Sequence, residues 1–439
     1  MLQFWHYLLR FLGMSVKRIA VVGAGISGLA CAYELQKKGF AVTVFEKEHQ
    51  VGGRMSSRKK DGLTFDIGAN HLCNMYAHMK AYCTELGVPF VPMKFLAYRV
   101  YKEGHIVPIM SALSRWSRWR LAIEFLKIRK NNLDFFNLNS TTAFDHTDAR
   151  TYMTAHIGHE ATAYIADAFS TTYQFHQAND ISLGAVKGVM ESLKYHIKDW
   201  DLQQTVGGMI ALSEAIAKKV TVQVHTPVSQ VIGGTTVQVV ADTIETFDAV
   251  VIATTADCTK KILSNPTAGQ RELLDATRYA STISLAFVVE AKALPDIAVV
   301  WVPRVESDTI SGMTNERMKG EGFVKDGKSL LCVWLHEEYA KRIMHLSDEE
   351  IYAKIKTEVL KYCPWFSEEA VLTPFDLQRW PAAMPKFYQG YLTTVRKFFE
   401  SSQGDNHVFF CGDYLNSTWT EGSLRCGQRV AEQVASSFV

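Results

Sequence analysis

A glycine motif between two apolar runs most strongly constrains how this chain folds. Residues 18–22 (RIAVV) precede residues 23–28 (GAGISG), and a second apolar run follows at 41–45 (AVTVF). In a strand–turn–helix unit, the first glycine makes the turn and the second admits a pyrophosphate. The third lets the helix pack against the strand. The motif therefore predicts a βαβ unit that binds a dinucleotide.

The residues after the motif support this prediction. A helix is expected from about 27 to 38, ending at Gly39, and its N-terminus would face the phosphates. The next strand ends at Glu46, whose carboxylate can accept hydrogen bonds from both ribose hydroxyls. Since the same carboxylate would repel a 2′-phosphate, NADP is disfavoured at this site.

Composition and charge narrow the classes of function that the chain can have. The chain has 439 residues and a formal net charge of +2, which does not favour binding to nucleic acid. Its eight cysteines form no CxxC pair, a pattern typical of reduced thiols in the cytoplasm, and we predict no metal site.

Two aromatic segments are unusual. Residues 1–13 are mostly apolar but too short to span a bilayer, so they are either an extension without a function or a weak interfacial anchor. Residues 115–120 (RWSRWR) are basic and aromatic. They are either a solvated helix start or a surface that touches lipid headgroups, which would make the protein peripheral to the membrane.

The pattern of elements alternates along the chain. Strands are expected near 63–66, 98–108, 220–254, 281–335 and 408–413, and helices near 119–130, 149–157, 160–173, 348–362 and 422–436. Buried parallel strands at 249–254 and 408–413 would join the first βαβ unit. The fold class is therefore α/β, with a nucleotide-binding unit assembled from both ends of the chain and a middle piece.

Several further motifs occur in a recognisable order: residues 52–54 (GGR), 66–69 (DIGA), 412–413 (GD) and 422–423 (GS). Together with the first motif they resemble the flavin amine oxidase superfamily, which includes monoamine oxidases, protoporphyrinogen oxidases and phytoene desaturases. The resemblance implies a Rossmann-like FAD-binding domain at 14–90, 200–275 and 385–439. It also implies a substrate domain of mixed β-sheet and helices at 91–199 and 276–384.

The resemblance assigns roles to individual residues. The pyrophosphate would be bound by the first motif with Arg54, and the flavin would be lined by residues 68–71. The full set implied to bind FAD is Gly23, Ala24, Gly25, Ser27, Gly28, Glu46, Lys47, Gly53, Arg54, Gly68, Ala69, Asn70, His71, Val228, Thr254, Gly412, Asp413, Gly422 and Ser423. No cysteine stands in the context used for covalent attachment, so we expect non-covalent FAD.

The substrate side gives two signals. Trp419 stands where monoamine oxidases carry a cage tyrosine, but the strand at 281–287 lacks the lysine usual in amine oxidases. Residues 148–153 and 379–385 resemble protoporphyrinogen oxidases and desaturases instead. His71 and Trp419 are the candidate catalytic residues.

Three functions remain open. The first is hydride removal from a C–H bond of an apolar small molecule, as in protoporphyrinogen oxidases and desaturases. The second is oxidation of an amine. The third is a flavin-dependent mutase or a structural flavoprotein. The sequence does not predict the electron acceptor or the oligomeric state.

Overall fold

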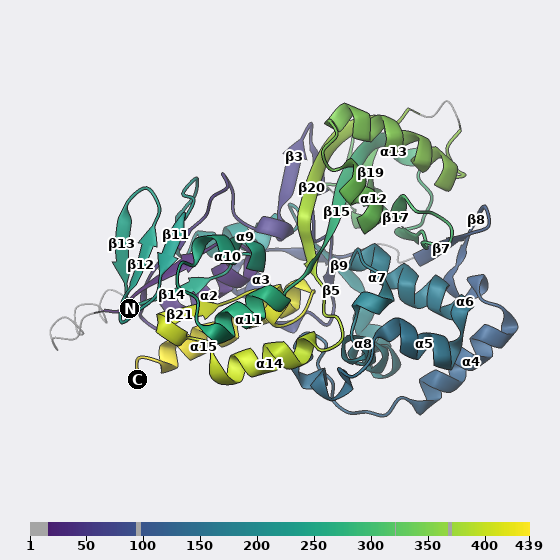
Figure 1. The fold of residues 1–439 in the computed structure, drawn as a ribbon. Helices are drawn as coiled ribbons and strands as arrows, with labels where there is room; N and C mark the ends of the chain where they lie inside the picture. The colour runs from purple at the N-terminus through teal and green to yellow at the C-terminus, as the bar shows by residue number, and fades with distance from the viewer. Residues whose placement is uncertain (1–15, 94–97, 321, 368–370) are drawn as a thin grey trace.

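The structure is a computed structural model that describes residues 16–93, 98–320, 322–367 and 371–439 (Figure 1). The apolar segment at 1–13 lies outside the described residues. The first described residues and the C-terminus lie on the same side of the molecule, beside the first sheet. None of the described helices is long and apolar enough to cross a membrane.

A five-stranded parallel sheet organises the half of the molecule that holds the first described residues and the C-terminus. Its central strand has four consecutive fully or nearly fully buried apolar residues, as expected for a strand covered on both faces. The strand order is β10 (Thr221–Gln223), β2 (Ala41–Phe45), β1 (Arg18–Val22), β14 (Ala249–Ile252) and β21 (Val408–Phe410). These strands come from the start, middle and end of the chain, as the interleaved pattern predicted.

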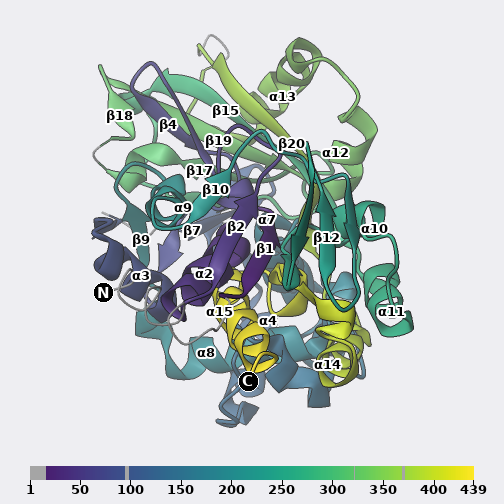
Figure 2. The same ribbon diagram turned by 90° about the vertical axis from the view of Figure 1, so that its left-hand side faces the viewer.

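Two helices from opposite ends of the chain pack against each other beside this sheet (Figure 2). Helix α2 (Ile26–Lys37) directly follows β1, and α15 (Thr420–Ser436) closes the chain. A Cβ atom on Gly427 of α15 would lie 3.0 Å from the Ala30 Cβ atom of α2. The glycine therefore permits a close approach of the two helices.

Smaller elements surround this sheet. A meander is formed by β11 (Gln230–Ile232), β12 (Val237–Val240) and β13 (Ile244–Phe247). Two helices, α10 (Ala256–Ile262) and α11 (Ala268–Ala276), follow β14, and α14 (Tyr391–Ser401) precedes β21. Helices α3 (Ala77–Leu86) and α9 (Ile210–Ala217) pack near α2.

A second, mixed sheet forms the other half of the molecule. Its order is β20 (Thr373–Pro385), β15 (Tyr279–Glu290), β19 (Lys328–Leu335), β17 (Ile310–Asn315), β16 (Val299–Trp301), β7 (Tyr98–Lys102) and β8 (His105–Pro108), with β18 (Val324–Lys325) on β19. Helices α12 (Glu337–Ile343) and α13 (Asp348–Tyr362) share an apolar core with it.

Two small sheets lie between the halves. They are the pair β3 (Ser57–Lys60) and β4 (Leu63–Asp66), and the sheet β5 (Leu72–Cys73), β9 (Leu202–Thr205) and β6 (Phe90–Pro92). The segment between β4 and β5 carries residues 67–71. It therefore passes between the two halves of the molecule, where the sequence predicted contacts with the flavin.

A helical layer lies below the second sheet in Figure 1. It contains α4 (Arg115–Lys127), α5 (Ala149–Ile157), α6 (His159–Ala161), α7 (Ala168–Tyr173) and α8 (Leu183–Tyr195). The expected helix at 160–173 is interrupted by a π-helical turn, η4 (Thr162–Asp167). The expected helix at 119–130 begins earlier, because the Ser114 side chain accepts a hydrogen bond from the Ser117 amide and caps it.

The predicted fold class is confirmed: the protein is α/β, with a parallel sheet beside a mixed sheet and a helical layer. All strands of the parallel sheet fall within the ranges predicted for the nucleotide-binding unit. The strands of the second sheet fall within the ranges predicted for the substrate domain, except that β20 extends one residue beyond them, to Pro385. The boundaries between these ranges stay a prediction.

Candidate functional site

The glycine motif forms a tight turn between β1 and α2. Gly23 has a φ of +104°, and a Cβ atom there would lie 2.9 Å from the Ala253 carbonyl oxygen. A Cβ atom on Gly28 would overlap the Gly23 carbonyl oxygen and lie 2.9 Å from the Ala253 Cβ atom. Both positions therefore require glycine because the backbone itself fills the space.

Gly25 differs from these two glycines. A Cβ atom on it would meet nothing within 4 Å, and its φ of −72° suits any residue. Gly25 is also the N-cap of α2, whose first turn has neither a side-chain cap nor an acidic residue. An open space before an uncapped helix N-terminus fits a pyrophosphate, because free amides and the helix dipole attract an anion.

Glu46 lies at the end of β2 beside this turn. Its Oε2 atom accepts a 2.7 Å hydrogen bond from the Ala24 amide, and its Oε1 atom accepts one from the Glu48 amide at 3.0 Å. The Thr226 amide donates to the Glu46 carbonyl oxygen, which brings the segment leading to Val228 alongside. Lys47, by contrast, is exposed and pairs with Glu48 at 3.3 Å.

The second glycine motif lies against the first. The Gly52 amide donates to the Ala24 carbonyl oxygen at 2.8 Å, and a Cβ atom on Gly53 would lie 3.6 Å from the Gly25 Cα atom. Residues 23–28, Glu46 and residues 52–54 therefore form one continuous surface, called here the nucleotide cradle.

Arg54 extends the cradle toward the end of the chain. Its guanidinium makes two bonds to the Asp413 carboxylate, at 2.6 and 2.9 Å, and a third to the Ala383 carbonyl oxygen at 3.0 Å. The sequence predicted a phosphate partner for Arg54 and did not predict this ion pair. The pair positions Asp413 at the cradle, because a bidentate bond fixes both side chains.

Backbone contacts connect Arg54 to the predicted flavin segment. The Ala69 amide donates to the Arg54 carbonyl oxygen at 2.8 Å, and a Cβ atom on Gly68 would overlap that oxygen. On the opposite side, the Thr254 methyl group would lie 3.4 Å from a Cβ atom on Gly23. The cradle, Gly68, Ala69, Thr254 and Asp413 therefore occupy one region.

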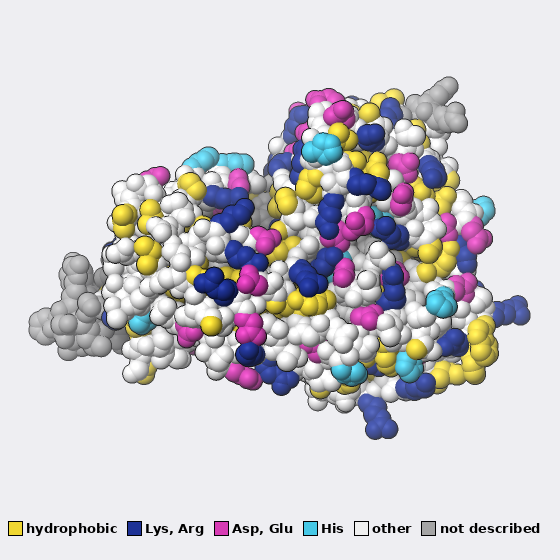
Figure 3. All heavy atoms as spheres, viewed as in Figure 1, with side chains coloured by type: hydrophobic (Ala, Val, Ile, Leu, Met, Phe, Trp, Pro, Cys, Tyr) yellow, Lys and Arg dark blue, Asp and Glu magenta, His cyan; other side chains and the backbone are white. Residues whose placement is uncertain are grey.

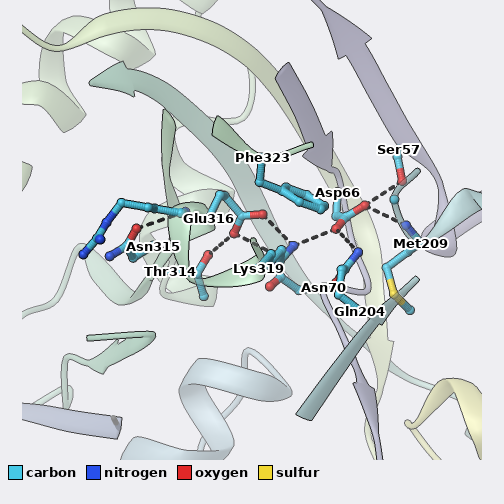
Figure 4. Close-up of polar contacts among 12 residues, drawn as sticks. Ser57, Asp66, Asn70, Gln204, Met209, Thr314, Asn315, Glu316, Lys319 and Phe323 are labelled. Carbon is cyan, nitrogen blue, oxygen red and sulfur yellow. Dashed lines mark hydrogen bonds and ion pairs between the residues drawn. The ribbon is translucent and has the colours of Figure 1, made fainter. Parts of the chain in front are cut away.

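A buried charge triad, Asp66, Glu316 and Lys319, lies behind the flavin segment (Figure 4). The Lys319 Nζ atom is 2.6 Å from Asp66 Oδ2 and 2.5 Å from Glu316 Oε2, and all three side chains are almost fully buried. Asp66 also accepts hydrogen bonds from the Ser57 hydroxyl and the Met209 amide.

The triad connects the β3–β4 pair to the second sheet, because Asp66 ends β4 and Lys319 follows β17. Asn70 and Thr314 both donate to the Glu316 Oε1 atom, at 3.4 and 3.0 Å. Burial disfavours the charged lysine, but the charges of Asp66 and Glu316 outweigh it and raise the pKa of Lys319. Lys319 is therefore charged at neutral pH.

His71 directly follows Asn70, which donates to Glu316 of the triad. Its side chain keeps a partly exposed face. Burial, and then the Lys319 charge, lower the pKa of His71 to about 4. The imidazole is therefore neutral at physiological pH. Its ring meets the Tyr173 ring edge-on, with centroids 6.4 Å apart.

Four rings form an aromatic cluster next to His71: Phe169, Tyr173, Trp301 and Trp419. The Phe169 centroid is 5.0 Å from Tyr173, 5.9 Å from Trp301 and 6.3 Å from Trp419. The Trp301 indole nitrogen donates to the Tyr173 hydroxyl at 3.2 Å. The cluster thus connects the two candidate catalytic residues, His71 and Trp419.

The π-helical turn η4 explains how two cluster residues reach this place. It ends at Asp167, directly before α7, the helix that carries Phe169 and Tyr173. A π-turn holds one extra residue and rotates the helix that follows, and such turns often occur at functional sites. Single-sequence periodicity does not reveal it, so the sequence did not identify Phe169 or Tyr173.

The first residues of α15, which the sequence predicted to face the flavin, also pack against neighbouring elements. The Glu421 carboxylate accepts hydrogen bonds from the His78 and Met79 amides at 2.9 Å and so caps α3. A Cβ atom on Gly422 would lie 2.9 Å from the Phe136 carbonyl oxygen, and the Ser423 amide donates to Trp419 within the first turn. Glu421 therefore points away from the aromatic cluster.

Among the described residues, no group of three or more His, Cys, Asp and Glu side chains could hold a metal ion. The eight cysteines are free, and Cys411 and Cys426 are buried beside α2. The arrangement that remains is a cradle with anion-binding geometry and, beyond the segment 68–71, a cluster of aromatic side chains.

Comparison with known proteins gives the family. The family model of flavin-containing amine oxidoreductases matches residues 26–435. Protoporphyrinogen oxidase 2 of Arabidopsis thaliana is 32% identical over 36% of this chain and 32% of its own length. A 4,4'-diapophytoene desaturase of Staphylococcus haemolyticus is 68% identical over 11% of this chain and 10% of its own length. The matched segments thus span a third or less of these relatives.

A solved structure extends the similarity to the whole fold. The crystal structure of a candidate protoporphyrinogen oxidase from Exiguobacterium superposes with a TM-score of 0.78. It covers 97% of this chain and 100% of the other, at 15% identity, so it supports the fold alone. With the family match over nearly the whole chain, the protein belongs to the flavin-containing amine oxidoreductases and is an FAD-dependent oxidoreductase.

Proposed function

We propose that the protein removes a hydride from a C–H bond of an apolar small molecule, in the manner of protoporphyrinogen oxidases and desaturases. The aromatic cluster is the observation that carries this proposal. Its four rings and their aromatic neighbours His71, Tyr98 and Phe135 are all uncharged at neutral pH. Such walls favour an apolar substrate, because a charged one would lose hydration without gaining a partner.

The FAD would lie non-covalently between the cradle and the cluster. Residues 23–28 would bind the pyrophosphate through backbone amides. Each Glu46 oxygen accepts one amide hydrogen bond and has a second lone pair, which would accept a hydrogen bond from a ribose hydroxyl. Residues 68–71 would lie along the flavin ring. Precipitation with acid should release all the flavin into the supernatant, and flavin retained by the precipitate would contradict non-covalent binding.

Bound FAD supplies the hydride acceptor. The chain's own residues orient the substrate and exclude water. His71 and Tyr173 would form one wall, Phe169 and Trp419 the next. Because His71 is neutral at pH 7, it lacks the acidic proton of an imidazolium, so we assign it a positioning role rather than that of an acid.

Amine oxidation is the second candidate, and Trp419 favours it. Its position before residues 420–422 (TEG) matches the cage aromatic of amine oxidases, and its ring is part of the cluster. Two observations weigh against it. Strand β15 carries no lysine, and the nearby Glu421 carboxylate caps α3, where it does not meet a cationic substrate.

Anaerobic absorbance titration of the purified protein tests the proposal. We expect porphyrinogens or polyenes to bleach the flavin band, and a panel of primary and secondary amines to leave it unchanged. Bleaching by amines alone would replace the proposal with the second candidate. A flavin that neither panel reduces would support a mutase or a structural flavoprotein.

We also propose a cytoplasmic location, on the chemistry of the cysteines. Cys31, Cys411 and Cys426 are buried near one another, yet all remain thiols. Free buried thiols are typical of a reducing compartment. Fractionation of cells that express the tagged protein should recover it from the cytoplasmic side.

A further inference from the structure

Helix α4 has a stripe of apolar side chains on the side that faces solvent. Trp116, Trp119, Ile123 and Leu126 are spaced i, i+3, i+7 and i+10, which places them on one helix face. Trp116 is 63% exposed, Trp119 is 53% exposed and Leu126 is 78% exposed. The two indoles stack on each other with centroids 4.7 Å apart. A folded protein rarely leaves such a stripe in water.

The opposite face of α4 is already satisfied. Ser117 donates to Glu160, and the buried Glu124 carboxylate bonds Tyr152 and faces Lys187 and His156. The only acidic residue of α4 is therefore turned inward. The helix is anchored by this polar side and by Leu121 and Phe125, which pack against a buried apolar cluster, so the stripe does not serve the protein's own core.

Basic side chains border the stripe. Arg115 and Arg118 are exposed on one side of it, Lys127 on the other, and Arg129 and Lys130 follow the helix. Figure 3 shows hydrophobic and basic side chains gathered over α4 at the lower right of the molecule. Tryptophans with flanking Lys and Arg are typical of membrane–water interfaces, where the rings enter the headgroup layer and the cations meet anionic lipids.

We propose that this stripe docks the protein on an anionic lipid bilayer. Trp116, Trp119 and Leu126 would enter the headgroup region, and Arg115 and Arg118 would contact lipid phosphates. The opposite charge of such a surface favours it over a second copy of the chain, which would bring a second set of basic residues to the same place.

The chain after α4 leads from this surface to the aromatic cluster. Residues Lys130, Asn132, Leu133 and Phe135 line a cavity of about 270 Å³ together with Glu191 of α8. The Phe135 ring meets Trp419 with centroids 6.1 Å apart. A bound bilayer would therefore lie next to a cavity whose wall contacts the cluster. The docking proposal does not depend on which substrate the cluster binds.

Vesicle flotation of the full-length protein tests the proposal. We expect binding to vesicles of phosphatidylglycerol and phosphatidylcholine, and much weaker binding to phosphatidylcholine alone. The variant W116A/W119A should bind at least tenfold more weakly. The variant R115Q/R118Q should lose about fivefold per charge at low salt, and the difference should shrink at high salt.

A matched variant controls for general effects. K354Q/K356Q removes two exposed charges from α13, at the far side of the second sheet, and should bind as the natural chain does. Unchanged flavin content and melting temperature would show that W116A/W119A folds. The proposal fails if W116A/W119A binds as well as K354Q/K356Q. It also fails if the natural chain ignores anionic vesicles but dimerises through Trp116 and Trp119.

Discussion

The nucleotide cradle and the aromatic cluster are built by opposite means. The cradle is made of backbone atoms from short motifs. The space beside Gly25 is open, whereas backbone atoms occupy the space beside Gly28. The cluster is made of large side chains from α7, β16 and the start of α15. The proposed cofactor site is therefore encoded by short local motifs, whereas the proposed substrate site depends on tertiary packing between distant segments.

The two glycines give the largest expected effects and the sharpest contrast. Gly28→Val should destabilise the protein by about 3 kcal/mol or more, because its side chain would overlap backbone atoms. Gly25→Val should leave the melting temperature of the flavin-free protein unchanged but weaken FAD binding at least a hundredfold, since the side chain fills the open space. Thermal melting and flavin fluorescence measure the two effects. Equal melting temperatures for the two variants would contradict the assignment.

The charge triad comes next. Lys319→Met leaves Asp66 and Glu316 buried without their cation, which should cost about 3–5 kcal/mol at pH 7. Since the folded-state pKa of Lys319 is raised, its contribution is fully present below pH 10 and would be lost only above it. Urea unfolding measures the loss. The exposed pair Lys397–Glu272 is the control, and Lys397→Met should change stability by less than about 1 kcal/mol.

The aromatic cluster should affect turnover without affecting the cofactor. Phe169→Ala removes the ring that contacts three other members, so substrate orientation should suffer and flavin reduction should slow about tenfold. Stopped-flow absorbance gives the rate. Phe366→Ala, at a partly buried ring that packs against the core of the second sheet, is the control and should keep the natural rate.

The smallest expected effect concerns His71. Because its folded-state pKa is about 4 and the unfolded value about 6.5, the unfolded chain binds more protons between these values. Stability should therefore fall as the pH drops from 7 to 5. After allowance for its partial exposure, His71 should account for about 1 kcal/mol of the loss.

Urea unfolding at pH 7 and pH 5 measures how much of the lost stability is due to His71. The variant His71→Gln should lose less stability than the natural chain, whereas the exposed His105→Gln should behave as the natural chain does. His176 and His336, whose pKa values are also lowered to about 4 by burial, contribute to the remaining loss. An unchanged slope in His71→Gln would mean that His71 takes up protons in the folded state.

Much of the fold was predictable because its signals are local. The run 18–22, the glycines and Glu46 fixed the first βαβ unit, and apolar runs located β14 and β21. The start of α4 was one of the two alternatives predicted for residues 115–120, but the Ser114 cap that fixes it was not identified. The π-turn at Thr162–Asp167 was missed because an extra residue leaves no periodic trace.

The candidate site was predictable in part for the same reason. His71 and Trp419 stand in motifs, so the sequence named them. Phe169 and Lys319 reach the site only through packing between segments more than a hundred residues apart, for which a single sequence gives no signal. The Arg54–Asp413 pair likewise depends on the meeting of the two chain ends.

One measurement tests most directly whether the cradle binds the cofactor and the cluster orients the substrate. It records flavin content and the anaerobic rate of flavin reduction in the same samples of Gly25→Val and Phe169→Ala. We expect Gly25→Val to be purified without flavin. We expect Phe169→Ala to keep one flavin per chain but to be reduced about tenfold more slowly by the apolar substrate that bleaches the natural protein. Loss of flavin in Phe169→Ala, or its reduction at the natural rate, would show that the cradle and the cluster do not have these separate roles.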